Sequence, residues 1–71
     1  MVDRAKFKYF TMRADLTLGD VAKHLGVNPA TLTRKMSGQS EFTREEIQKT
    51  RELLNMSVEE SEAVFFGHEV A

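Results

Sequence analysis

The sequence predicts an all-α domain, a compact bundle of about five short helices. Helix-start signals, in which a polar cap residue precedes a carboxylate or a proline, recur along the chain. Glycine or asparagine stands where several of these helices should end. The 71 residues allow one small domain, residues 1–71, and contain no cysteine that could form a disulfide or a thiolate metal site.

The first helix is predicted from the cap at Asp3 to about Ala14. Asp3 carries a side-chain oxygen that can accept a hydrogen bond from the first turn of a helix. Phe7, Phe10 and Ala14 follow at i, i+3 and i+7, so they share one face, which we expect to be buried.

A second helix is predicted over residues 18–25. Thr17 with Asp20 forms a start similar to a capping box, with aspartate in place of the usual glutamate. Gly26 stands where a left-handed C-cap is expected.

A third helix is predicted from Pro29 to about Met36. Asn28 is a favoured N-cap, and proline is favoured at the first helical position. Leu32 and Met36 recur at i and i+4 as the inward residues, and Gly38 ends the helix.

The fourth helix is predicted from the capping box of Thr43 and Glu46 to Leu54. Thr50 is expected at the edge of its buried face. The predicted buried residues are Ile47, Leu53 and Leu54.

A fifth helix is predicted from the capping box of Ser57 and Glu60, with Val58 facing inward. Its end is open, because residues 63–66 could continue the helix or form a strand leading into an extended C-terminal tail. Gly67 would stop either element.

Charge is distributed unevenly along the chain. The net charge is −1 and the isoelectric point is about 6.1, whereas nucleic-acid-binding domains are usually basic. Residues 1–38 carry seven lysines or arginines and three aspartates, a net +4, whereas residues 39–71 carry three cations and eight glutamates, a net −5. This asymmetry predicts either a cationic working face in the first half or merely uneven scatter among short helices.

Several classes of function are not expected. His24 and His68 lie far apart without neighbouring ligands, so no metal or other cofactor is predicted. The chain shows no nucleophile–base pairing and no glycine-rich phosphate loop, so we expect neither an enzyme nor a small-molecule substrate. No apolar run reaches a membrane span and no secretion signal is visible, so a cytoplasmic location without membrane contact is expected.

Residues 17–37 have the organisation of a helix-turn-helix. A small residue, Ala22, stands where two helices would cross closely, and Gly26 occupies the tight turn. Val27 would fill the corner, and Leu32 would anchor the second helix. In such a unit the second helix lies in the DNA major groove.

This stretch resembles the helix-turn-helix of phage repressor and Cro proteins, members of the lambda repressor-like, XRE-type family. The family pattern T-x-x-x-L/V-A-x-x-L-G-V-S/N-x-x-T-L/I-x-R is matched by Thr17, Val21, Ala22, Leu25, Gly26, Val27, Asn28, Thr31, Leu32 and Arg34. The segments RKMSGQSEFTREEI and LLNMSVEESEAVFF are similar to the parts that follow in small Cro-like regulators, so the resemblance covers roughly residues 7–66. It implies a lambda repressor-like fold and a phage or prophage regulator in a bacterial cell, which occludes promoters by binding a double-stranded DNA operator.

The resemblance also implies which residues contact DNA. They are Thr17, Asn28, Pro29, Ala30, Thr31, Thr33, Arg34, Gln39, Ser40 and Arg44. Bases would be read from the predicted third helix, where Arg34 can pair with guanine and Ala30 can contact a thymine methyl group. Phosphates would be held by amides near Thr17 or by the loop that contains Gln39, Ser40 and Arg44, although Glu41 opposes the loop. The simpler alternative is that Thr33, Arg34 and Lys35 form a solvated helix face.

The chain departs from the family at several positions. Pro29 and Ala30 stand where glutamines are common, and Leu18 replaces a frequent polar contact. These changes favour a weak reader or one that reads methyl groups. Thr11 and Met36 replace an arginine and a glutamate that form a buried ion pair in some relatives. Losing both partners together strands no buried charge.

A homodimer is expected, held partly by residues 64–70 and in particular by Val64, Phe65 and Phe66. Neighbouring residues on a helix point about 100° apart, so Phe65 and Phe66 cannot both face one core. The alternative is that both phenylalanines pack inside the domain. A different function is also open, in which the helix-turn-helix serves as a protein-interaction module or as an antitoxin-like regulator with weak DNA binding.

Overall fold

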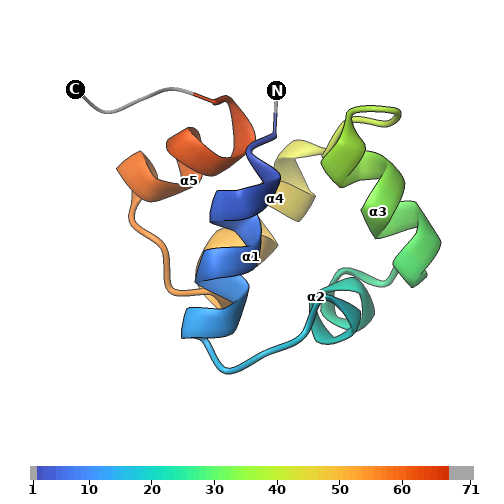
Figure 1. Cartoon of the computed structure of the whole chain (residues 1–71), viewed down its shortest axis with the longest axis horizontal. Helices are drawn as coiled ribbons and strands as arrows, with labels where there is room; N and C mark the ends of the chain where they lie inside the picture. Colours follow the sequence, from blue (N-terminus) through green and yellow to red (C-terminus); the bar gives the residue numbers. More distant parts are fainter. Residues whose placement is uncertain (1, 68–71) are drawn as a thin grey trace.

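The protein is described by a computed structural model over residues 2–67, which form five α-helices (Figure 1). The helices are α1 (Arg4–Arg13), α2 (Leu18–Leu25), α3 (Pro29–Ser37), α4 (Arg44–Leu53) and α5 (Val58–Phe65). No strand occurs within the described residues. The prediction of an all-α bundle of short helices is therefore confirmed.

Every helix begins at the predicted cap. Asp3 accepts a hydrogen bond from the Lys6 backbone N–H at 3.0 Å, and Asn28 accepts one from the Thr31 N–H at 2.7 Å. The other three helices begin with a capping box, in which the cap hydroxyl and the carboxylate three residues later each accept a backbone N–H from the other residue. These pairs are Thr17–Asp20, Thr43–Glu46 and Ser57–Glu60.

Left-handed residues end α2 and α3. Gly26 has φ of 75° and Gly38 has φ of 89°, a region where a Cβ atom is strained. The Val27 N–H donates to the Ala22 carbonyl at 3.0 Å and so closes the end of α2. Both helix ends therefore lie where the sequence places them.

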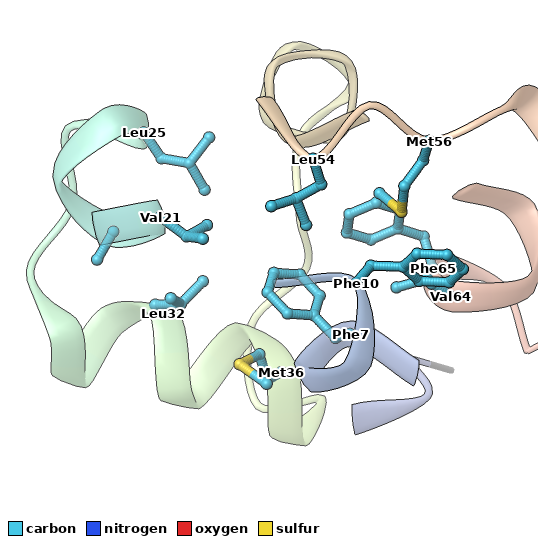
Figure 2. Close-up of a cluster of buried hydrophobic side chains, with 11 residues drawn as sticks. Phe7, Phe10, Val21, Leu25, Leu32, Met36, Leu54, Met56, Val64 and Phe65 are labelled. Atoms are coloured by element: carbon cyan, nitrogen blue, oxygen red, sulfur yellow. The ribbon is translucent and has the colours of Figure 1, made fainter. Parts of the chain in front are cut away.

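All five helices meet in one hydrophobic core (Figure 2). Phe7 is completely buried, its ring stacked on Phe42 at 5.9 Å and in edge contact with Phe65 at 5.8 Å between centroids. Figure 2 shows the side chains of α2 and α3 entering this core from one side and those of α5 from the other. The buried members are Phe7, Phe10, Val21, Ala22, Leu25, Leu32, Met36, Leu54, Met56, Val64 and Phe65.

The predicted buried face of α4 needs a correction. Thr50 is completely buried and does not lie at the edge, whereas Ile47 and Leu53 are only half-buried. The Thr50 hydroxyl donates to the Glu46 carbonyl at 2.8 Å, so no polar group is stranded. Leu54 is buried as predicted.

Two predictions about α5 are also resolved. Val58 is 57% exposed, so the prediction that it faces inward is wrong. Residues 63–65 continue the helix, and Phe66 is its C-cap. The Val64 carbonyl accepts the Asp3 N–H at 2.7 Å, which joins the start of α1 to the end of α5.

The three residues expected at a dimer interface, Val64, Phe65 and Phe66, differ in their burial. Val64 and Phe65 are buried in the core of their own chain, so they are not available to a partner. Phe66 is 51% exposed. Residues 68–70, also expected to contribute, and a possible extended tail lie outside the described residues.

Thr11 and Met36 are both accommodated in the interior of the domain. Thr11 is 3% exposed, and its hydroxyl donates to the Phe7 carbonyl at 2.8 Å. Met36 is 4% exposed and belongs to the apolar core.

Ala22 is 1% exposed on α2, which packs against α3 and α4. We expect Ala22→Leu to lower the free energy of unfolding by about 1–3 kcal/mol, because a larger side chain overpacks this contact. Thermal unfolding measures the loss. Ala5→Leu, the same change at an exposed position of α1, is the matched control and should leave the melting temperature nearly unchanged. Equal melting temperatures for both variants would contradict the tight packing of Ala22.

Candidate nucleic-acid interface

Helices α2 and α3 are joined by a three-residue turn, residues 26–28, and lie at the end of the molecule opposite α5 (Figure 1). Val27 in the turn is half-buried and packs against the core. Leu32 anchors α3 from the inside, with 1% of its surface exposed. The turn and the core together hold one face of α3 outward.

That outward face consists of small and polar side chains. Ala30, Thr33, Arg34 and Ser37 recur at i, i+3, i+4 and i+7 and are all exposed. The face has no bulky apolar residue, so a groove of DNA could approach the helix backbone closely.

Three side chains on α3 donate hydrogen bonds within the helix, namely Arg34, Thr33 and Ser37, whose hydroxyl donates to the Arg34 carbonyl at 3.0 Å. The Arg34 guanidinium donates through Nη2 to the Thr31 hydroxyl at 3.2 Å, and the Thr33 hydroxyl donates to the Pro29 carbonyl at 3.0 Å. Arg34 therefore lies along the first turns of α3 and keeps other N–H donors for a partner. Thr33 presents its methyl group and hydroxyl oxygen.

Nine of the ten residues predicted to contact DNA are exposed, and Thr31 is half-buried. The residues from 28 to 34 lie together on α3 and its cap. Thr17 caps α2, and Gln39 and Ser40 follow the end of α3. Arg44 lines a hollow between α4 and α5 together with Phe66, so it is turned toward α5.

The start of α2 is a weaker phosphate site than the sequence suggests. The Asp20 carboxylate accepts the Thr17 backbone N–H at 2.9 Å and therefore occupies one of the amides expected to bind phosphate. Hydrogen bonds from the Thr17 backbone and hydroxyl lower the pKa of Asp20, which keeps a negative charge at this position. A phosphate would be repelled by that charge.

Two backbone donors of the loop after α3 are also already used. The N–H groups of Gln39 and Ser40 donate to the Arg34 carbonyl at 3.0 and 3.4 Å. The side chains of Gln39 and Ser40, both exposed, remain polar groups that this loop can offer to a phosphate.

Lys35 is held away from the outward face by an ion pair that the sequence analysis missed. Its Nζ lies 2.9 Å from Oε1 of Glu46 and also donates to the Glu41 carbonyl at 3.0 Å. The side chains of Lys35 and Glu46 are only 12% and 14% exposed. The pair joins the end of α3 to the start of α4. No local pattern marks it, because its members belong to different helices.

The cations of the first half do not gather on α3. Four of the seven are on α1, namely Arg4, Lys6, Lys8 and Arg13. One is Lys23 on α2, and Lys35 is paired with Glu46. Arg34 is therefore the cation that the outward face of α3 presents, and the predicted cationic face is smaller than the charge count suggests.

Comparisons with protein-family models, curated proteins and solved structures find no match to this chain. Within residues 2–67, no helix is long and apolar enough to cross a membrane. The same residues contain no group of three or more histidine, aspartate or glutamate side chains placed to hold a metal ion.

The Lys35–Glu46 pair predicts a specific loss of stability in acid. Burial raises the pKa of Glu46, but hydrogen bonds from Lys35 and the Thr43 backbone outweigh it, so its pKa lies below the usual 4.5. The stabilisation is present above pH 4.5 and is lost as the pH falls through the lower folded-state pKa.

We expect Glu46→Gln to destabilise the domain at neutral pH and to flatten the acid side of its stability curve. Chemical denaturation between neutral and acidic pH measures both effects. Glu45→Gln changes an exposed carboxylate on the same helix and is the control. The same pH dependence in Glu46→Gln as in the unaltered chain would rule out the stabilising role of the pair.

Proposed function

We propose that the chain is a sequence-specific double-stranded DNA-binding transcriptional regulator, similar to phage repressor and Cro proteins, which acts as a homodimer. The observation that carries the proposal is the exposed α3 face of Ala30, Thr33 and Arg34, held outward by a three-residue turn and a buried Leu32. This combination has the form of a recognition helix on a helix-turn-helix.

In this function α3 enters the major groove and reads bases with short side chains. Arg34 donates to O6 and N7 of a guanine. Ala30 and the Thr33 methyl group contact thymine methyl groups, and the threonine oxygens add hydrogen bonds. Readout therefore combines one strong polar contact with several methyl contacts.

Two features of the molecule favour action as a dimer. A single module of this kind buries only about 600–1,000 Å² of protein surface on DNA. The start of α2 carries the Asp20 carboxylate and Lys35 is already paired, so few phosphate contacts supplement α3. Two linked modules whose recognition helices are about 34 Å apart reach successive major grooves and bind more tightly than one. Bound in this way, the protein would occlude a promoter.

The test is selection of bound sequences from a random double-stranded DNA pool. We expect enrichment of a pseudo-palindromic site whose affinity falls steeply with salt concentration. Failure to enrich any sequence, with binding that does not depend on salt, would contradict the proposal and favour the protein-interaction module or weak antitoxin-like regulator.

Arg34→Ala should weaken binding to the selected site by about 1–3 kcal/mol and relax the preference at one base pair in each half-site. Repeating the selection with the variant measures both changes. Lys8→Ala, which removes an exposed cation from α1, is the control and should retain the original preference. An unchanged base preference in Arg34→Ala would exclude a reading role for this residue.

A further inference from the structure

Helices α4 and α5 form the two walls of a shallow hollow on the surface. Arg44, Ile47 and Arg51 line it from α4, and Val58, Glu62 and Phe66 line it from α5. Val58 and Phe66 are more than half exposed although both are large and apolar, and Ile47 is half-buried between them. We call this region the α4–α5 surface. Exposed apolar residues gathered at one place and rimmed by charge are typical of a protein interface.

The charges on the two walls are opposite in sign. Arg44 and Arg51 stand on the α4 wall, and Glu62 stands on the α5 wall. The side chains of Arg51 and Glu62 make no hydrogen bond or ion pair with any residue from 2 to 67. Both charges therefore remain available to a partner.

The other surface with large exposed apolar side chains is different. It lies along α1, where Tyr9 and Met12 are exposed. Two of its neighbouring cations are already engaged within the chain, because Lys6 pairs with Asp3 at 3.9 Å and Arg13 pairs with Glu60 at 3.2 Å. Part of the charge along the α1 surface is thus committed within the chain, whereas the Arg51 and Glu62 side chains on the α4–α5 surface are not.

We propose that a second copy of the chain docks on the α4–α5 surface, with α4 of each copy against α5 of the other. This inference rests on one part of the proposed function, namely that the protein acts as a homodimer. A two-fold axis along the hollow exchanges the two walls, so that Arg51 of each copy meets Glu62 of its partner around a centre of Ile47, Val58 and Phe66. The surface is self-complementary in charge and apolar at its centre, as an isologous interface requires.

This surface adjoins the candidate DNA interface. Ile47 and Phe66 also line a second hollow that reaches Gly38 and Ser40, at the end of α3. A second copy docked here would therefore extend toward the C-terminal end of α3. Val64 and Phe65 take no part in the contact, because both are in the core.

Complementary charge reversals test the interface. Arg51→Glu or Glu62→Arg alone places like charges across both symmetry-related contacts, and each should raise the dimer dissociation constant about tenfold or more. An equimolar mixture of the two variants restores opposite charges at both contacts. Sedimentation equilibrium at low ionic strength should show the mixture associating to within a few-fold of the unaltered chain.

A matched pair of variants controls for charge changes in general. Lys49→Glu on α4 and Glu59→Arg on α5 reverse charges of the same sign on the same two helices, but neither residue lines the hollow. Their mixture should associate no more tightly than either variant alone. Circular dichroism melting of every variant checks that its fold is retained.

Two results would overturn the inference: an unaltered chain that remains monomeric at millimolar concentration, or a mixture of Arg51→Glu and Glu62→Arg that associates no better than each variant alone. Binding of the unaltered chain to a single DNA half-site is measured separately, because this binding needs no dimer. An unaltered chain that does not dimerise but still binds a single half-site refutes the docking surface and leaves the DNA-binding proposal standing. A dimer restored by mixing, in a chain that binds no DNA sequence, refutes the DNA-binding proposal and supports the docking surface.

Discussion

Helices of eight to ten residues are marginal in water, and all five helices of this chain have that length. The fold therefore depends on one shared core, and its centre is Phe7. Phe7 contacts Phe42 in the loop between α3 and α4, and it contacts Phe65 near the end of α5. The outward direction of α3 follows from this core, because Leu32 and Met36 are buried in it and leave Arg34 on the opposite side. A helix this short has no other means of presenting a fixed face to a partner.

The boundaries of the helices could be predicted because they depend on neighbouring residues. A capping box joins residues three apart, so Thr17 with Asp20 identifies a helix start without any knowledge of the fold. Gly26 and Gly38 mark helix ends for a similar reason, since the left-handed conformation is a property of single residues. The position of the α2–turn–α3 unit along the chain follows from these local signals, whereas the exposure of the outward α3 residues depends on the core.

Burial on α4 and α5 could not be predicted in the same way, because it depends on which helix packs where. Thr50 has a polar side chain, but its hydroxyl donates to the Glu46 carbonyl of the same helix. The residue therefore packs like a small apolar one. Val58 is apolar, yet it lies at the first position of α5 beside the hollow with α4 and stays exposed. Residues 63–65 include strand-favouring side chains, but they stay helical where Val64 and Phe65 pack into the core.

Charge shows the same contrast between composition and arrangement, and it connects the two proposals. The first half of the sequence is cationic, but its cations are mostly on α1, and Lys35 is joined to Glu46. In the proposed function α3 therefore brings one strong cation to DNA, and the phosphate contacts that usually supply most of the affinity are few. A second module compensates for this, because linking two weak readers turns the second binding step into an intramolecular one. The α4–α5 surface carries charges that have no partner within the described chain, and these charges could supply that link. Because one copy makes few phosphate contacts, its binding to DNA would depend on a second copy joined to it through the α4–α5 surface.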